Sequence, residues 1–556
     1  MKTPFRNIKR YREIVQILFK YGFDDLLDQT GLDKYFKGGV TIFSRGKSKE
    51  VEKLSRQERV RQALEELGPT FVKFGQMLSI RPEIVPIQYL NELEKLQDQV
   101  APFPEEEARK IVEEEFGESP ESIFKEFKRE PLAAASLAQV HRAQLQSGEE
   151  VIVKVQRPNI KDKIESDLEI LFNMANIISK RVSKELIYEP TEVLSEFKHW
   201  INKELDFVQE ARNIERFKNH FEGNENICIP EVYWDYCSPK VITMEYIDGI
   251  RISDVEKIEA AGVDRKELAR MGADITLKQI FDFGFFHGDP HPGNIFVLED
   301  NVIVPMDFGL VGSLDKELRD HLAQLLSGFV HKNVERIVRV FFNMGIIDDN
   351  LNLRGLKLDI SEMIDRYYQL EIKHLNIEQI IEDVTGLVTK YKIKLPKNLF
   401  LMAKAMSLME GIAEKLDPEF NMIAVSRPHV RKFMIKRWSP RRLTSELFLF
   451  LEDIKDLAET TPTSLKRILM KLRKGKLGLN LHHEDLDRFI HMLDKASNRI
   501  SFSLIIAALI IASSVLINFG RGLLLFGVPA IGLVGYLIAA IMGLWLVIAI
   551  LRSGRL

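Results

Sequence analysis

The sequence His287-Gly288-Asp289-Pro290-His291-Pro292-Gly293-Asn294, followed by Asp307-Phe308-Gly309, decides the fold class of this chain. The apolar residues between the two motifs are interrupted at 299–301, a pattern that predicts a β-hairpin. Asp289 and Asn294 have the spacing of a phosphoryl-transfer loop, in which the aspartate orients the acceptor and the asparagine holds a metal ion. We therefore predict that Asp289 is catalytic and that Asn294 and Asp307 bind Mg²⁺.

Two further elements lie upstream, in the order that a two-lobed kinase requires. Val151-Ile152-Val153-Lys154-Val155 predicts a strand whose lysine neutralises the phosphates of ATP. Met244-Glu245-Tyr246-Ile247 follows another predicted strand, in the position of an adenine-binding hinge, so Glu245 and Tyr246 are predicted nucleotide contacts. A lone Asp-Phe-Gly is common by chance, whereas the ordered set is specific. The loop contains two histidines, His287 and His291, but no third histidine or thiolate that could complete a metal site. This favours a structural role for both histidines.

The loop that should cover the phosphates contains alanine where a protein kinase has glycine. An alanine Cβ disfavours positive φ and holds the backbone farther from the phosphates. A simple small-residue turn is the alternative, but the position directly before the strand pair favours a nucleotide loop. Its predicted nucleotide-binding residues are Pro131, Leu132, Ala133, Ala134, Ala135, Ser136, Leu137, Ala138 and Gln139.

Taken together, these motifs resemble the AarF/UbiB atypical kinases, whose eukaryotic members are mitochondrial coenzyme Q proteins. Lys73-Phe74-Gly75-Gln76 is similar to the Lys-x-Gly-Gln motif of that family, and Glu204-Leu205-Asp206 to its Glu-x-Asp motif. The resemblance covers roughly residues 55–430 and the C-terminal hairpin of bacterial members. Leu137-Ala138 departs from the family, where Ile-Gly is common.

The resemblance implies a protein-kinase-like fold, ATP and Mg²⁺ as cofactors, ATPase activity and a role in isoprenoid quinone (ubiquinone) biosynthesis. It also implies that the N-terminal extension suppresses ordinary protein phosphorylation. Lys73 and Gln76 share one helical face, which from the residues alone is typical of a solvated surface. The resemblance implies instead that they plug the acceptor site against Glu204 or Asp206.

The partner of Lys154 is expected on a single helix predicted over 192–221. Asp206, Glu210 and Asn213 share one face of that helix. We predict that Glu210 pairs with Lys154, and Glu204 is the alternative.

Composition excludes several protein classes. The chain has 556 residues, of which 45% are hydrophobic and 29% charged, so it is not a disordered chain and should form several structural units. Its 78 Lys+Arg and 81 Asp+Glu give a net charge of −3, without the basic excess of a general nucleic-acid binder. Cys228 and Cys237 are too few for a disulfide framework, and we expect two unpaired thiols in a reducing compartment.

Two apolar runs at the C-terminus predict a transmembrane hairpin. Between Ser501 and Leu551, Arg521 is the only charged residue. Leu504–Phe519 and Ile531–Leu551 are long enough to span a bilayer, and a buried hairpin of a soluble protein is the alternative. The positive-inside rule predicts an inner-membrane protein whose polar region faces the cytoplasm. The basic flanking residues are Lys495, Arg499, Arg552 and Arg555.

Two basic stretches, 427–442 and 466–476, precede the hairpin. The first contains interleaved apolar residues, a composition that suits either an anionic membrane surface or a solvated helix face. The nearby hairpin favours anionic membrane lipid as the partner.

The predicted fold class is α+β, a two-lobed protein-kinase-like fold with a helical N-terminal extension and a C-terminal transmembrane helical hairpin. We expect the extension over 1–125, the N-lobe over 126–249, the C-lobe over 250–440, a basic helical juxtamembrane region over 441–498 and two membrane helices in 499–556. The leading hypothesis is a membrane-anchored ATPase that acts on, or extracts, lipid-like quinone precursors. Alternatives are a small-molecule or protein phosphotransferase and a nucleotide-binding scaffold for quinone-biosynthesis enzymes. The intact Lys154, Asp289, Asn294 and Asp307 disfavour a scaffold without turnover.

Overall fold

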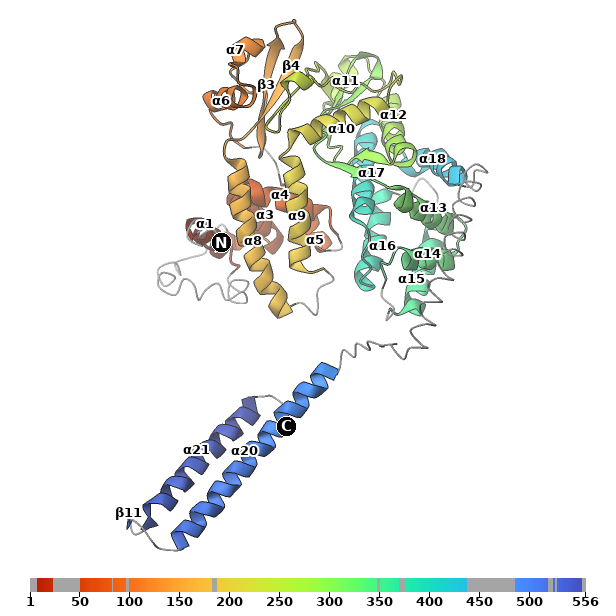
Figure 1. Ribbon diagram of the computed structural model, residues 1–556. Coiled ribbons are helices and arrows are strands. Elements are labelled where there is room, and N and C mark those ends of the chain that lie inside the picture. The colour runs from red at the N-terminus through yellow and green to blue at the C-terminus, as the bar shows by residue number, and fades with distance from the viewer. Residues whose placement is uncertain are drawn as a thin grey trace, which may run out of the picture. The chain divides into compact units, whose positions relative to one another are not determined.

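A computed structural model describes residues 8–23, 51–82, 84–96, 100–182, 188–347, 351–369, 376–437, 486–518, 524–525 and 528–552. The chain divides into two compact units, 1–444 and 445–556 (Figure 1). Most of the expected juxtamembrane region, including the basic stretch 466–476, lies outside the described residues.

A five-stranded antiparallel sheet forms the small lobe. Its strands are β1 (Phe124–Phe127), β2 (Ala133–Ala134), β3 (Ala138–Leu145), β4 (Glu150–Gln156) and β5 (Val241–Glu245), in the order β1-β3-β4-β5 with β2 paired to β3. Alternate residues Val151, Val153 and Val155 are fully buried and pack against α6 (Glu105–Phe116), which Figure 1 shows beside the sheet. Gly148 has a φ of 109° at the β3–β4 turn, where a side chain would be strained.

Helices of the N-terminal extension pack against two helices that follow β4. The extension contains α1 (Ile8–Lys20), the 3₁₀ turn Val51–Lys53, α3 (Arg56–Leu67), α4 (Pro69–Ser79) and α5 (Ile87–Leu93). Its helix α4 contacts α8 (Ile160–Val182) and α9 (Pro190–Glu204). In addition, Arg10 of α1 forms an ion pair of 2.7 Å with the fully buried Asp167 of α8. The extension is thereby attached to the kinase-like lobe by buried polar contacts as well as by apolar packing.

The prediction of one helix over 192–221 was wrong, because two helices occupy this segment. The first, α9, ends at Glu204, and α10 (Phe207–His220) begins after Asp206. The Asp206 side chain accepts a hydrogen bond of 3.1 Å from the backbone N–H of Val208, and this N-cap starts a new helix.

The large lobe is mostly helical and contains two small sheets. α12 (Arg265–Leu277) continues into a π-helix, η5 (Lys278–Phe283), and then into β7 (Phe285–His287), which pairs with β10 (Val311–Ser313). The predicted hairpin between the two motifs is confirmed as β8 (Ile295–Val297) and β9 (Ile303–Pro305), joined through the 3₁₀ turn Glu299–Asn301. β6 (Ile250–Arg251) lies beside β8. The small lobe also contains α7 (Pro120–Ile123) and the 3₁₀ turn Trp234–Tyr236. The other elements of the large lobe are the 3₁₀ turn Pro292–Asn294 and the helices α11 (Val255–Ala260), α13 (Lys316–Val330), α14 (Val334–Asn343), α15 (Leu353–Gln369), α16 (Ile377–Lys390), α17 (Lys397–Leu416) and α18 (Met422–Arg437).

The core of the large lobe forms where α12 packs against α17. Ala269, Ala273 and Ala405 are fully buried at this contact, and such small side chains let two helices approach closely. Cys228 and Cys237 are both unpaired, as expected from the composition.

The second unit consists of α20 (Leu486–Asn518) and α21 (Ala530–Arg552), with the short strands Leu524–Leu525 and Val528–Pro529 between them. Ser497–Asn518 and Ala530–Val547 are long and apolar enough to cross a membrane. Only 6% of the first segment and 11% of the second are buried, so most of their apolar side chains face outward in this unit. Gly532 and Gly535 pack against Ser513, which brings the two helices close together.

Candidate nucleotide site

A partly buried ion pair joins the sheet of the small lobe to α10. Lys154 on β4 donates hydrogen bonds of 2.8 and 2.9 Å to the two carboxylate oxygens of Glu210. Burial alone would lower the pKa of Lys154, but the carboxylates of Glu210 and Asp307 outweigh it and raise that pKa. Lys154 therefore carries a charge that is fixed in place. Of the two alternative partners, Glu210 is the one that contacts Lys154.

Asp307 lies beside this ion pair, just after β9. Its Oδ1 accepts a hydrogen bond of 3.0 Å from the N–H of Gly309. Burial opposes ionisation, but the positive charge of Lys154 and this hydrogen bond outweigh it and lower the pKa of Asp307 to about 2. Asp307 is therefore ionised at neutral pH, as a metal ligand must be.

The Asp307-Phe308-Gly309 motif is also attached to α10. Phe308 is fully buried, and its ring packs against Phe217 of α10 at 5.0 Å and against His287 at 5.6 Å. Asn213 of α10 donates a hydrogen bond of 3.0 Å to the carbonyl of Phe308. One helix thus positions both Glu210 and the segment that contains Asp307.

The two histidines shape the loop that contains Asp289 and Asn294. The N–H of Asp289 donates to Nδ1 of His287 at 3.2 Å, and the N–H of Gly293 donates to Nδ1 of His291 at 3.2 Å. The carbonyl of His291 accepts from the N–H of Asn294 at 2.8 Å. These contacts agree with the structural role that ligand number predicted for both histidines.

The alanine-rich loop is fixed by backbone contacts. Ala133 and Ala134 form β2, and the N–H of Ala135 donates to the carbonyl of Ala138 at 2.8 Å. Arg157, which the sequence analysis did not single out, donates through Nε to the carbonyl of Ala135 and through Nη2 to that of Ala101, both at 2.8 Å. The loop is therefore attached to the segment that precedes the small lobe.

Several loop side chains point into the protein in this arrangement. Ser136 is fully buried, and Leu137 packs with Met77 of α4 and with α8. Gln139 accepts a hydrogen bond of 3.1 Å from the N–H of Phe103, and its amide nitrogen lies 2.8 Å from Nε2 of His141. The side chains that remain most exposed are near the start of the loop, where Leu132 is 52% exposed.

The hinge residues make protein contacts through their N–H groups. Glu245 donates to the carbonyl of Glu231 at 2.9 Å, and Tyr246 donates to that of Glu150 at 3.0 Å. The guanidinium of Arg142 lies 4.2 Å from the centre of the Tyr246 ring. In this arrangement, carbonyl groups or side chains of Glu245 and Tyr246 would have to provide any contact to adenine.

The extension approaches the same site from α4. Lys73 is 8% exposed and forms an ion pair with Glu204, at the end of α9. Asp206, the other expected partner, caps α10 instead. Gln76 donates a hydrogen bond of 3.2 Å to the carbonyl of Leu96, within the extension. The structure thus brings Lys73 and Glu204 together and places Gln76 and Asp206 in separate contacts.

Known families match most of this architecture. The family model of the ABC1 atypical kinase-like domain matches residues 95–341, that of the UbiB helical domain matches 360–421, and that of the ABC1/UbiB kinase-like C-terminal domain matches 484–552. A Pseudomonas aeruginosa protein named "Probable protein kinase UbiB" is 34% identical over 467 residues, which cover 83% of this chain and 88% of the relative.

Two further comparisons concern an uncharacterised relative and a solved structure. A Clostridium pasteurianum protein, described as "Uncharacterized protein in hydrogenase 1 5'region", is 32% identical over 554 residues, which cover 99% of this chain and all of the relative. The solved structure of Rv3197 from Mycobacterium tuberculosis, in complex with erythromycin, is 24% identical, with a TM-score of 0.46, and the alignment covers 65% of this chain and 92% of that chain. The domain matches and the UbiB relative confirm the resemblance and the kinase-like α+β fold class, and the chain belongs to the AarF/UbiB family of atypical kinases.

Proposed function

We propose that this chain binds Mg-ATP and hydrolyses it, or transfers its γ-phosphoryl group, in support of isoprenoid quinone biosynthesis. The main observation behind the proposal is the partly buried Lys154–Glu210 pair next to the ionised Asp307. Phosphoryl transfer requires fixed positive charge for the phosphates and oxygen ligands for a metal ion. Membership of the AarF/UbiB family, whose resemblance implies a role in ubiquinone biosynthesis, supports this link.

The residues present suit Mg²⁺. Asp307 and Asn294 offer a carboxylate and an amide oxygen, which are hard ligands. Over the described ranges, no group of three or more His, Cys, Asp or Glu residues could hold a metal ion. A site with few protein ligands is typical of Mg²⁺, which usually keeps water and phosphate oxygens as its other ligands.

Each residue of the site would have a distinct role. Lys154, fixed by Glu210, neutralises negative charge on the phosphates, and Asp289 orients the attacking hydroxyl or water. Asp307 and Asn294 would hold Mg²⁺, which supplies charge neutralisation at the phosphate oxygens when bound. The alanine-rich loop, from Pro131 to Gln139, would cover the phosphates.

The extension favours hydrolysis or a small acceptor over a protein acceptor. The ammonium of Lys73 is buried, and its charge acts on both Asp307 and Glu210. A helix in this position would restrict the access of a protein segment to the reacting phosphate. We therefore assign Lys73 and Glu204 a regulatory role, in which their ion pair limits access to the reacting phosphate.

The C-terminal unit would anchor the chain in the inner membrane. α20 and α21 expose their apolar side chains over the length of a bilayer. The basic residues Arg499 and Arg552 flank the two spans on the side of the polar region. The catalytic unit would then face the cytoplasm and act on, or extract, lipid-like quinone precursors.

ATP hydrolysis by the full chain in lipid nanodiscs tests the reaction. Lys154→Met should reduce turnover about 100-fold or more, because it removes fixed electrostatic stabilisation. Lys125→Met is the matched control, since Lys125 is an exposed lysine of the same sheet, on β1. Equal activity of the parent protein and Lys154→Met would refute the assignment of the site.

Complementation tests the biological role. In a bacterial strain that lacks its own UbiB protein, the parent gene should restore the content of isoprenoid quinone, measured by mass spectrometry. The Lys154→Met gene should not restore it, whereas the Lys125→Met gene should. Full restoration by Lys154→Met would separate the quinone role from nucleotide chemistry.

A further inference from the structure

The segment that joins the extension to the small lobe has little backbone freedom. It covers residues 100–104, directly before α6, and we call it the connector. Pro102 and Pro104 fix their own φ angles and restrict the residue before each of them. The side chain of Phe103 packs against the core of the small lobe. A displacement at one end of the connector would therefore be transmitted to the other end.

The extension holds the chain close to the start of the connector. Gln76 of α4 donates a hydrogen bond of 3.2 Å to the carbonyl of Leu96, four residues before the connector. Gly75 packs so tightly against the same leucine that a Cβ at this position would overlap Cδ1 of Leu96. The position of α4, which contains Lys73, therefore determines where the connector begins.

Arg157 binds the connector and the alanine-rich loop together. It directly follows β4, and its N–H donates to the carbonyl of Leu137 at 2.8 Å. Its Nε donates to the carbonyl of Ala135 in the loop, and its Nη2 donates to that of Ala101 in the connector, both at 2.8 Å. The guanidinium also lies 5.5 Å from the centre of the Phe103 ring. A guanidinium suits such a bridge, because its N–H groups point in fixed and different directions.

A second bridge runs through the core of the small lobe. The N–H of Phe103 donates to Oε1 of Gln139 at 3.1 Å, and Nε2 of Gln139 lies 2.8 Å from Nε2 of His141. Nδ1 of His141 lies 2.9 Å from the carbonyl of Lys128, which can only accept. His141 therefore carries its proton on Nδ1, and its Nε2 accepts from the amide of Gln139. The bridge requires a neutral imidazole.

The surroundings of His141 favour that neutral form. The ring is fully buried, stacks on Phe127 of β1 at 4.9 Å, and has Val153 as its neighbour on β4. From α6, Glu105 and Arg109 act on the ring with opposite charges. Burial is the main influence and lowers the pKa of His141 below its ordinary 6.5. Protonation would place a second N–H against the glutamine amide and would break the bridge.

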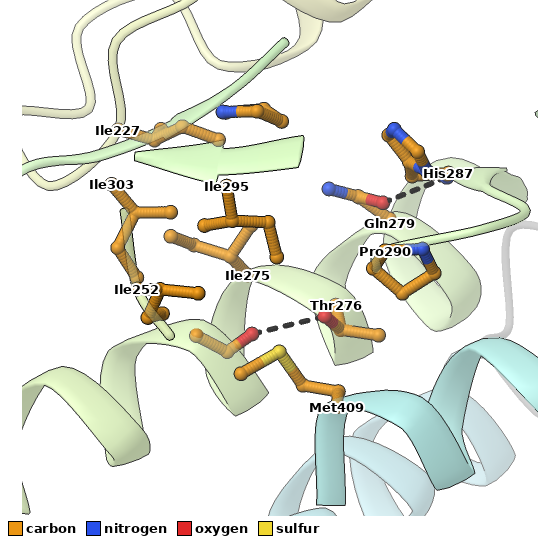
Figure 2. A pocket seen from close by; sticks show the side chains of 12 residues that line it. Ile227, Ile252, Ile275, Thr276, Gln279, His287, Pro290, Ile295, Ile303 and Met409 are labelled. Atoms are coloured by element: carbon orange, nitrogen blue, oxygen red, sulfur yellow. Dashed lines mark hydrogen bonds between the residues drawn. The ribbon is translucent and has the colours of Figure 1, made fainter. Parts of the chain in front are cut away.

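The catalytic loop is supported differently. Gln279 of η5 accepts a hydrogen bond of 3.0 Å from the N–H of His287, beside a small cavity (Figure 2). The residues that line this cavity of about 30 Å³ all lie between Ile227 and Met409, outside the extension. This support of the loop that contains Asp289 is therefore independent of the connector.

We propose that the connector couples the extension to the alanine-rich loop, with Arg157, Gln139 and His141 as positioning residues for nucleotide binding. The extension would thereby set how closely the loop covers the phosphates of ATP, while the catalytic loop stays in place. The inference rests on the proposed function, because it concerns the loop that is proposed to cover the phosphates. It also gives Gln76 a role, which is to fix the chain near the start of the connector.

The test uses the full chain in lipid nanodiscs, with Mg-ATP as the nucleotide. Hydrolysis gives KM and kcat, and amide hydrogen exchange is followed over 100–104 and 131–139 without nucleotide. Arg157→Gln should speed exchange in both segments and raise KM about tenfold, as expected for the loss of one hydrogen bond from a charged donor, with kcat within about twofold of the parent. Arg157→Lys should give intermediate values, because it keeps the charge and loses the planar fork. The matched control, Arg212→Gln, changes an exposed arginine of α10 and should behave as the parent does.

Gln76→Ala tests the link to the extension. It should speed exchange over both 100–104 and 131–139 and raise KM, because the chain near the start of the connector is released. Gln88→Ala is the matched control, since Gln88 is an exposed glutamine of α5, and it should change neither quantity.

Gln139→Glu tests the second bridge through its pH dependence. In the parent, exchange over 131–139, corrected for the intrinsic rate of each amide, should become faster as acid protonates His141. In Gln139→Glu the dependence should reverse, because the carboxylate accepts from protonated His141 and loses that bond as the pH rises. Gln144→Glu, on the same strand, should keep the dependence of the parent.

Several results would overturn the inference. Equal KM and exchange in the parent and in Arg157→Gln would show that Arg157 does not position the loop. An equally large loss of kcat, or the same changes in Arg212→Gln, would indicate general destabilisation. Unchanged exchange over 131–139 in Gln76→Ala would separate the extension from the loop, and the pH dependence of the parent in Gln139→Glu would exclude the histidine bridge.

One further result separates this inference from the proposed function. A parent protein that binds no nucleotide, but whose exchange over 131–139 still responds to Gln76→Ala and Arg157→Gln, would refute the proposed function and support the coupling.

Discussion

Replacing Asp307 by asparagine removes one negative charge from the partly buried group that Asp307 forms with Lys154 and Glu210, while the side chain keeps its shape. The pKa of Asp307 is about 2, compared with an ordinary 3.8. That difference corresponds to at most about 2.5 kcal/mol, at about 1.36 kcal/mol for each pKa unit. We expect Asp307→Asn to destabilise the nucleotide-free protein by up to this amount at neutral pH.

The sign of the pH dependence follows from the lowered pKa. The folded state favours the ionised carboxylate, so its stabilising effect is complete above the unfolded pKa of 3.8 and is lost as the pH falls through about 2. The stability difference between the parent and Asp307→Asn should therefore be constant near neutral pH and should shrink in strong acid.

Nucleotide titration tests the metal role of the same residue. Mg-ATP at 100 times its dissociation constant should stabilise the parent by about 2.7 kcal/mol, and this gain should disappear in Asp307→Asn. Thermal unfolding of the full chain, with and without Mg-ATP, measures both effects. Asp300→Asn is the matched control, because Asp300 is exposed and has a φ of 59° that asparagine tolerates. An equal response to Mg-ATP in the parent and in Asp307→Asn would refute the assignment of Asp307 as a metal ligand.

Three other predictions concern Asp289, the alanine-rich loop and the C-terminal hairpin. Asp289→Asn should leave Mg-ATP binding largely intact and reduce phosphate release about 100-fold or more, and an equal loss of both would mean that its role is not catalytic. Ala133→Gly should change nucleotide preference or permit autophosphorylation, because glycine lets the loop approach the phosphates; unchanged nucleotide affinities and phosphate incorporation would exclude this loop from phosphate contact. Gly535→Val should separate α20 from α21, because a Cβ at this position overlaps Oγ of Ser513. Cysteine cross-linking between the two helices measures that separation, and unchanged cross-linking would contradict the packing.

Local sequence patterns were sufficient to predict those strands and helices whose signal lies within a short segment. The alternation around Lys154 predicted β4, and the polar break at 299–301 predicted the β8–β9 hairpin. Helical spacing placed Glu210 and Asn213 on one face, and the structure uses that face to hold Lys154 and Phe308. The two histidines, which ligand number predicted to be structural, accept backbone hydrogen bonds within the loop that contains Asp289.

The break between α9 and α10 shows where local patterns mislead. Apolar periodicity continues across Leu205 and Asp206, so the sequence predicted one helix. The side chain of Asp206 instead caps the second helix, which frees Glu204 to face Lys73. An aspartate whose spacing fits a helix interior can instead cap the start of a new helix. Which of the two occurs depends on the hydrogen-bond partners that the rest of the protein provides.

The sequence by itself determined the kinase-like family, since Lys154, Asp289, Asn294 and Asp307 occur in the order that the family requires, and it determined two apolar C-terminal segments through their length and lack of charge. Only the tertiary structure decided that Gln139 turns towards Phe103 and His141, that Arg157 holds the alanine-rich loop, and that Lys432 reaches Asp282. The contacts of Arg157 and Lys432 join residues that are 22 and 150 positions apart in the sequence. The contacts of Gln139 fix the direction of a side chain whose orientation the sequence leaves open. Spacing along the chain encodes periodicity and local turns, whereas such long-range pairs form only when the packed helices and strands bring distant polar groups within hydrogen-bond distance.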